Sequence, residues 1–304
     1  MQKKISDRQI QAEVGPEQDG MRLDAFWAFK LQDHGLSRNR IRQQIKESKA
    51  VRNDSLCTKP AIEVQAGDRL LLTLPPQETG IVPQAGDVQV VWQDQDLAVI
   101  NKPPGLSVHP APSETEHTLV HRLVHRFPDL EGQDAHRPGI VHRLDKDTSG
   151  LLLVALHDRV RTAISRSLAS REVDKEYLAL VYGCPDQDEA WIDLPVGRDE
   201  RRKTRMAVKR DQGRPAQSWY QVLAVFEPVP CALLRIRIVT GRTHQIRVHL
   251  AHMGHAVLGD RVYGPQQAAA MDRKCPALAR MIKRQMLHAW YLGFHHPSTR
   301  EWQS

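Results

Sequence analysis

The sequence lacks the features that mark several common classes of protein. Only four of its 304 residues are cysteines, they lie far apart, and no two form a Cys-x-x-Cys pair. This spacing argues against a zinc ribbon and against a disulfide-dense secreted scaffold. No apolar run approaches the roughly 20 residues that span a bilayer, and residues 1–15 are polar without the apolar core of a signal peptide. We therefore expect a cytoplasmic protein with no membrane partner.

Three motifs of nucleotide binding and nucleophilic catalysis are also missing. The chain has no Gly-x-Gly-x-x-Gly, no Gly-x-x-x-x-Gly-Lys-Ser/Thr and no Gly-x-Ser-x-Gly. Their absence removes the commonest nucleotide-cofactor and serine-hydrolase interpretations.

Positive charge, in contrast, is in excess: the chain has 43 Lys and Arg against 36 Asp and Glu, which gives a net charge of +7 and a pI near 9.3. This balance favours a polyanionic partner such as RNA.

The most informative segment is His-Arg-Leu-Asp-Lys-Asp-Thr-Ser-Gly at residues 142–150. It runs directly into six apolar residues, 151–156, which predict a buried strand. A polar loop attached to a core strand is held as rigidly as a catalytic group must be, so Asp145 is the residue whose role has to be explained. A calcium-binding loop fails because Leu156 stands where a bidentate Glu is needed. An ordinary strand-entry turn remains open on these residues alone.

The same segment resembles the signature of the RluA-type pseudouridine synthases, His-Arg-Leu-Asp-x-x-Thr-Ser-Gly, at every fixed position. Further blocks agree in order and spacing and cover most of residues 88–304. These are Asn-Lys-Pro-Pro-Gly-Leu-Ser-Val-His-Pro at 101–110, Lys-Glu-Tyr at 175–177, Gly-Arg-Thr-His-Gln-Ile-Arg at 241–247, and Leu-His-Ala at 287–289 with Phe294 and His296-Pro297. The chain stops soon after the last of these, where relatives often continue, so we expect a truncated C-terminus.

The resemblance implies a set of site residues. Asp145 would act on the ribose, either attacking C1′ or removing a proton from C2′. Arg242 would pair with Asp145 and keep it ionised against burial, and Tyr177 would stack on the uracil and help to remove the C5 proton. Core packing is the alternative role of Tyr177 and of Ile246. The implied substrate-binding residues are Arg143, which would fill the gap left by the extruded base, Ile246, which would wall the base, His142 and Lys175.

The implied reaction sets what else the site needs. The C1′–N1 bond is cut, the uracil turns, and C1′ is rejoined to C5, with no redox change or outside energy. We therefore expect no cofactor. Seven histidines fall on two predicted helices, which prompts the hypothesis of a zinc site. The sequence has no catalytic spacing of a carboxylate and two histidines, so we expect no metal. These histidines are His117, His121, His125, His244, His249, His252 and His255.

The N-terminal part of the chain is a candidate RNA-binding module. Apolar residues from Leu23 to Leu31 recur at helical spacing, Ile41 and Ile45 predict a second helix, and alternation at 62–64 and 70–74 predicts strands. Two helices and a small sheet resemble an S4 RNA-binding domain. A solvated basic face is the alternative. The RNA-binding residues implied are Arg38, Arg40, Arg42 and Lys46.

We divide the chain into a loosely ordered tail at 1–18, the S4-like domain at 19–75, a Pro- and Gly-containing linker at 76–87 and a catalytic domain at 88–304. Strands and helices without regular βαβ alternation indicate an α+β fold. The resemblance implies a mostly antiparallel, mixed sheet. Seven basic residues between 198 and 210 form either a solvated loop or a phosphate-binding arm.

The sequence thus predicts a monomeric isomerase that converts uridine to pseudouridine in structured RNA. The two-domain layout favours large-subunit ribosomal RNA over tRNA. A non-catalytic RNA-binding protein would need the basic surface but not Asp145, Tyr177 and Arg242 together. A methyltransferase would need a Gly-rich cofactor turn, and the chain has none.

Overall fold

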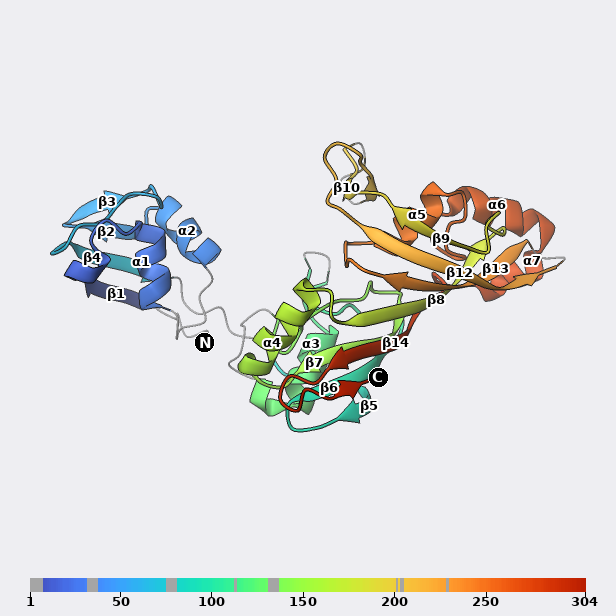
Figure 1. Cartoon of the computed structure of the whole chain (residues 1–304), viewed down its shortest axis with the longest axis horizontal. Coiled ribbons are helices and arrows are strands. Elements are labelled where there is room, and N and C mark those ends of the chain that lie inside the picture. Colours follow the sequence, from blue (N-terminus) through green and yellow to red (C-terminus); the bar gives the residue numbers. More distant parts are fainter. Residues whose placement is uncertain are drawn as a thin grey trace, which may run out of the picture. The chain divides into compact units, whose positions relative to one another are not determined.

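The structure is a computed structural model, which describes residues 8–31, 38–74, 81–111, 114–130, 137–200, 202, 205–227 and 230–304. The described residues form two compact units that divide near residue 80 (Figure 1). Each unit has its own hydrophobic core. No helix in the described ranges is long and apolar enough to cross a membrane. Residues 76–80 of the predicted linker, and Arg201 and Lys203 of the basic stretch, lie outside the described residues.

The first unit packs two helices on a four-stranded antiparallel sheet. The helices are α1 (Leu23–Lys30) and α2 (Arg38–Lys46), and a short 3-10 turn, η1 (Pro16–Gln18), precedes them. The sheet order is β1-β4-β2-β3, with β1 at Arg8–Glu13, β2 at Ala50–Arg52, β3 at Ser55–Cys57 and β4 at Arg69–Leu74. The predicted inward-facing Ile41 and Ile45 are fully buried in its core.

Two expectations for this unit are wrong. Residues 8–13, placed in a loosely ordered tail, form β1, because their backbone pairs with the whole length of β4. The strand expected at residues 62–64 is reduced to an isolated bridge between Arg22 and Glu63. The backbone of this segment pairs with the residues that lead into α1, through the bonds from the Leu23 N–H to the Ile62 carbonyl and from the Val64 N–H to the Met21 carbonyl. Val64 is buried there, but Ile62 is 37% exposed.

The second unit is built on a nine-stranded sheet of order β5-β6-β7-β14-β8-β13-β12-β9, with β15 paired to β14. Only the pairing of β7 with β14 is parallel, so the predicted α+β, mostly antiparallel fold is confirmed. The strands are β5 (Gln89–Gln93), β6 (Leu97–Lys102), β7 (Ser149–Ala155), β8 (Asp174–Tyr182), β9 (Glu189–Asp193), β12 (Gln217–Phe226), β13 (Cys231–Ile238), β14 (Leu287–His295) and β15 (Trp302–Gln303). A separate hairpin pairs β10 (Val196–Arg198) with β11 (Met206–Val208).

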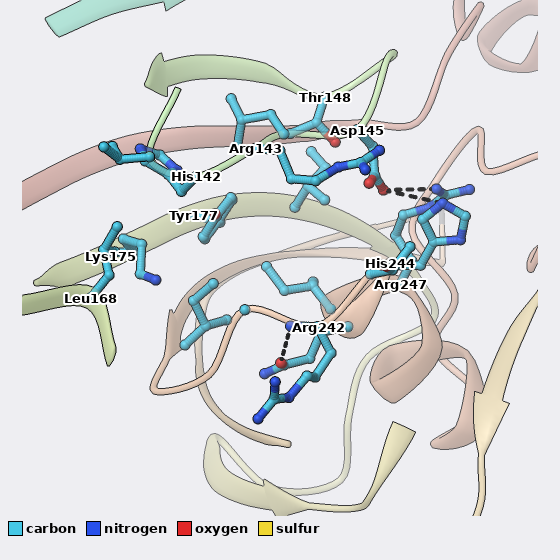
Figure 2. A pocket seen from close by; sticks show the side chains of 18 of the residues that line it. His142, Arg143, Asp145, Thr148, Leu168, Lys175, Tyr177, Arg242, His244 and Arg247 are labelled. Carbon is cyan, nitrogen blue, oxygen red and sulfur yellow. Dashed lines mark hydrogen bonds and ion pairs between the residues drawn. The ribbon is translucent and has the colours of Figure 1, made fainter. Parts of the chain in front are cut away.

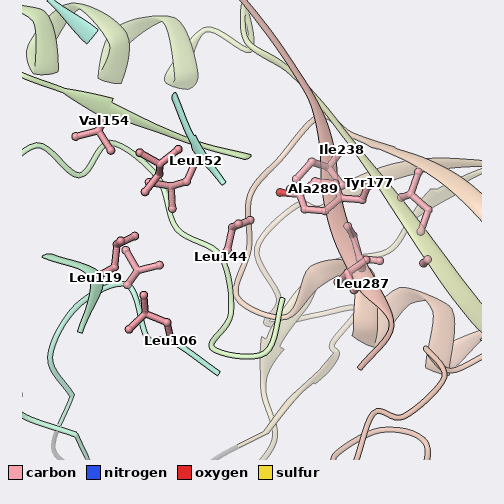
Figure 3. Close-up of a cluster of buried hydrophobic side chains, with 14 of the residues drawn as sticks. Leu106, Leu119, Leu144, Leu152, Val154, Tyr177, Ile238, Leu287 and Ala289 are labelled. Atoms are coloured by element: carbon pink, nitrogen blue, oxygen red, sulfur yellow. The ribbon is translucent and has the colours of Figure 1, made fainter. Parts of the chain in front are cut away.

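Helices cover both faces of β7, which explains its continuous apolar sequence. Leu152 and Val154 join α3 (Leu119–Arg126) in one cluster, whereas Leu153 and Ala155 join α4 (Asp158–Ala169) in another. The remaining helices are η3 (Pro128–Leu130), α5 (Gln245–His252), α6 (Pro265–Lys274) and α7 (Pro276–Met281). Figure 3 shows that Leu144, immediately before Asp145, belongs to the first of these clusters.

Candidate active site

The signature loop at residues 142–150 is fixed at several points. Leu144 is buried in the core, and the Thr148 N–H donates to the Asp145 carbonyl at 3.1 Å, which closes a turn. Gln285 Nε2 donates to Thr148 Oγ1 at 2.7 Å. At Gly150, where φ is +113°, a Cβ atom would collide with the backbone of Ala289 on β14. The glycine of the signature is therefore required by the close parallel approach of β7 to β14.

Lys102, at the end of β6, also fixes the signature loop. Its place in the sequence predicts no role for it in the site. Its ammonium is fully buried and donates to the carbonyls of Pro103 at 2.8 Å, Leu106 at 2.9 Å and Lys146 at 2.9 Å. Burial lowers the pKa of Lys102 to about 8, against the opposing charges of Asp147 and Asp145. The lysine therefore ties the turn after β6 to the residue that follows Asp145.

The Asp145 carboxylate is paired with Arg247 of α5. Arg247 Nη1 lies 2.8 Å from Asp145 Oδ2, while Nε and Nη2 of the same guanidinium bind the two oxygens of Asp260 at 2.6 and 3.0 Å. Burial alone would raise the pKa of Asp260, but the bonds from Arg247 and from the Val262 and Tyr263 N–H groups outweigh it and lower that pKa. One arginine thus serves two carboxylates.

The predicted ion pair between Asp145 and Arg242 is wrong. Arg242 Nε donates to the Pro215 carbonyl at 3.0 Å, and the Arg242 N–H donates to Gln245 Oε1 at 3.0 Å. Gln245 fixes the turn before α5 in this way, so the Arg242 side chain is directed away from Asp145. Figure 2 shows Arg242 across the cavity from the Asp145–Arg247 pair. The signal for Arg247 was present in the sequence, as the second arginine of the block at 241–247.

A cavity of about 330 Å³ collects the predicted site residues of the second unit (Figure 2). Asp145 and Arg143 come from the signature loop, Tyr177 and Lys175 from β8, and Ile246 from the start of α5. Two more predicted residues, His142 and Arg242, also line it. A second cavity of about 650 Å³ adjoins the first at Asp145, Arg143, His244 and Arg247. The structure brings these residues together, and their roles stay predictions.

Burial sets the protonation of the groups around this cavity. Burial, with the charge of Asp145, raises the pKa of Tyr177 well above its usual 10, so the phenol is neutral. Burial, with the charge of Lys175, lowers the pKa of His142 to about 3, and His142 Nε2 accepts the Leu153 N–H at 2.9 Å. Arg143 is exposed, and its Nη1 lies 3.3 Å from His109 Nε2.

The predicted RNA-binding residues of the first unit surround a buried carboxylate. Asp24 has a side chain only 1% exposed, and Arg38 Nη2 lies 2.9 Å from its Oδ1 and Arg42 Nε 3.5 Å from its Oδ2. Arg22 also pairs with it at 3.1 Å. Lys46 is exposed, and the side chain of Arg40 lies outside the described residues. A purely solvated face is therefore wrong for Arg38 and Arg42, because both neutralise Asp24.

Four of the seven histidines that prompted a metal hypothesis, His121, His244, His249 and His255, take part in side-chain hydrogen bonds. His249 bonds Ser218 Oγ at 3.0 Å and the Leu194 carbonyl at 2.9 Å, and His255 bonds the Tyr182 carbonyl at 3.0 Å. Over the described part of the chain, no three His, Cys, Asp or Glu side chains are arranged to hold a metal ion.

Comparison with known proteins adds to this geometry. A sequence model of the family described as RNA pseudouridylate synthase matches residues 96–252. The chain is 38% identical over 296 residues to an uncharacterized RNA pseudouridine synthase of Bacillus subtilis, covering 97% of this chain and 92% of that protein. It is 37% identical over 292 residues to ribosomal large subunit pseudouridine synthase D of Escherichia coli K12, covering 95% and 87% respectively. The solved structure of human RNA pseudouridylate synthase domain containing 1 superimposes with a TM-score of 0.55 at 29% identity, over 72% of this chain and 84% of that one.

Proposed function

The chain belongs to the RNA pseudouridylate synthase family and is an RNA pseudouridine synthase, an isomerase; from this membership we propose that its target uridines lie in large-subunit ribosomal RNA. The proposal is supported by the name of the Escherichia coli relative, which aligns with 95% of this chain. A net charge of +7 is consistent with a large polyanionic substrate.

In the proposed mechanism Asp145 is the catalytic carboxylate. One observation carries this assignment: its Oδ2 is held by Arg247 at 2.8 Å at the boundary of the two cavities. In both routes to the product, attack of the carboxylate on C1′ or removal of the C2′ proton, the group must be ionised. A cation in contact favours that form. Arg247 thus takes the role that was expected of Arg242, that of the cation paired with Asp145.

The neighbouring residues receive the extruded base. A uridine stacked in folded RNA must leave its stack to reach Asp145, at a cost of a few kcal/mol. Tyr177 lines the cavity with a buried, neutral ring, which supports its proposed role of stacking on the uracil. Ile246 lines the same cavity. Arg143, which is exposed, would occupy the gap that the base leaves in the RNA.

The first unit supports a second contact with RNA. We propose that residues 19–75 act as the S4-like domain, with the guanidinium groups of Arg38 and Arg42, each about half exposed, directed to phosphates. The enzyme would work as a cytoplasmic monomer without a membrane partner, as expected for a protein whose substrate is ribosomal RNA.

The test of the catalytic assignment is Asp145→Asn. It keeps the shape of the side chain and removes its charge, so we expect no pseudouridine while RNA binding and fold persist. Asp147→Asn is the matched control, because Asp147 is an exposed carboxylate two residues further along the same loop. Product formation would be measured in single-turnover reactions on ribosomal RNA fragments. A rate for Asp145→Asn within tenfold of wild type would contradict the proposal.

A further inference from the structure

His244 lies beside Asp145 in an unusual backbone conformation. It precedes α5 with φ +56°, in the left-handed region that few non-glycine residues adopt. This conformation directs the imidazole toward the signature loop, with His244 Nε2 3.9 Å from Asp145 Oδ2 (Figure 2). The other ring nitrogen, Nδ1, lies 2.8 Å from the Tyr263 hydroxyl. His244 therefore spans the distance between Tyr263 and the candidate catalytic carboxylate.

The hydrogen bonds around Tyr263 determine which nitrogen of His244 carries the proton. The Met206 N–H donates to the Tyr263 oxygen at 2.9 Å, so the hydroxyl proton is left to donate to His244 Nδ1. In the neutral ring the proton is then on Nε2, the nitrogen that faces Asp145.

The charges around the imidazole keep it neutral. Burial lowers the pKa of His244, and the nearby Arg247 and Arg143 act in the same direction, while Asp145 and Asp260 oppose them. The net shift is downward, so at neutral pH the ring is a neutral donor with its N–H toward the carboxylate.

Arg247 and His244 both direct an N–H group toward the same oxygen of Asp145. Arg247 Nη1 binds Oδ2, and His244 Nε2 faces Oδ2. Oδ1 accepts no hydrogen bond from any residue in the described ranges, so it is the oxygen left to act on the ribose. The separation of 3.9 Å is longer than a hydrogen bond, as catalytic contacts often are before substrate enters.

We propose that His244 is a positioning residue whose Nε2–H closes on Asp145 Oδ2 when the uridine enters, so that Oδ1 is presented to the ribose. The inference rests on the proposed role of Asp145. Tyr263 takes part by fixing the position of the proton, and its ring also lies 5.0 Å from the Arg247 guanidinium carbon, against the second donor. Two donors from one short segment thus orient one carboxylate.

The experiment compares His244→Gln with His244→Met in the full-length chain. The two side chains are similar in length and impose the same strain at positive φ, but only glutamine carries an N–H donor. Removing one preorganised donor costs about 10²-fold in rate. We therefore expect His244→Met to lower the saturating single-turnover rate constant about 10²-fold, with an unchanged half-saturating RNA concentration. His244→Gln should stay within about tenfold of wild type.

The controls separate positioning from folding and from RNA contact. His252→Met makes the same change at an exposed histidine of α5 and should leave the rate constant unchanged. Equal rate constants for His244→Gln and His244→Met would overturn the inference, and so would a loss in His244→Met that resides mainly in the half-saturating concentration. If wild type forms pseudouridine and Asp145→Asn does not, those results leave the proposed function standing. An active Asp145→Asn would remove the proposed function itself.

Discussion

Arg247 divides its nitrogen atoms between two acids of unequal burial. Asp260 has a side chain that is 0% exposed, whereas that of Asp145 is 19% exposed. The guanidinium therefore has a structural contact on one side and a contact at the cavity on the other. Removing it would leave two carboxylates without a cation, one of them in the interior.

We expect Arg247→Met to lower both stability and rate. Loss of one partner from a buried pair costs about 3–5 kcal/mol, measurable by urea denaturation. Arg247→Lys should restore the charge but only part of the rate, since an ammonium cannot grip Asp260 and Asp145 together. Arg242→Met removes a cation from the same cavity without touching Asp145, so its loss of rate should be smaller than that of Arg247→Met.

The sign of the pH dependence of stability tests the same pair. Since the pKa of Asp260 lies below its usual 3.8, its contribution in wild type is fully present above that pH and is lost as pH falls through the lowered pKa. Without Arg247, only the Val262 and Tyr263 N–H bonds oppose the effect of burial, so the pKa of Asp260 should be higher than in wild type and the acid loss of stability smaller. An acid loss of the same size in Arg247→Met would contradict the assignment.

For single residues, the sequence identifies the loop that carries Asp145 but not the arginine that pairs with this carboxylate. Asp145, Tyr177 and Ile246 line one cavity, and each lies in a segment whose pattern the sequence makes recognisable. The choice between Arg242 and Arg247 depended on the Gln245 side chain, which fixes the turn, and on a positive φ at His244. Neither is visible in residue spacing.

Among the elements, β6 supports the signature loop through one lysine. Lys102→Met would remove the donor of three carbonyls: the bond to Leu106 is buried, and those to Pro103 and Lys146 are partly buried. At about 1–3 kcal/mol for a buried unsatisfied group, we expect a loss of about that size in the free energy of unfolding, with a lower rate because residue 146 is released. Lys146→Met is the matched control: the Lys146 side chain is 53% exposed and its Nζ pairs with Glu114 at 3.2 Å, so the change should alter stability by less than about 1 kcal/mol. Equal losses in the two variants would contradict this role of Lys102.

Periodicity predicted some elements and missed others for physical reasons. Leu70, Leu72 and Leu74 alternate on β4 and are all buried. Helix α6 was missed because its inward side is made of small residues, Ala268 among them, packed with Met271. Strand β1 was missed because only Ile10 and Ala12 of its polar sequence pack against the core.

For the whole molecule, the two separate cores mean that the units can be tested apart. We expect a chain lacking residues 1–80 to fold, to bind structured RNA more weakly and to show a flatter dependence of affinity on salt. Each lost phosphate contact removes roughly 0.7–0.9 from the slope of log K against log salt. Binding would be titrated at several salt concentrations. Lys46→Gln, at an exposed position of α2, should change the slope by less than one, and an unchanged slope after the deletion would contradict a role of the first unit in RNA binding.

The parallel pairing of β7 with β14 also bears on how the enzyme is made. Gly150 lies against Ala289, and β14 separates β7 from β8 in the sheet, so the loop that carries Asp145 is braced by a strand near the end of the sequence. Contacts so distant along the chain form slowly, because a long loop must close before they contribute. During synthesis residues 287–295 leave the ribosome well after the signature loop, and the nascent enzyme therefore acquires its catalytic geometry only once β14 has emerged.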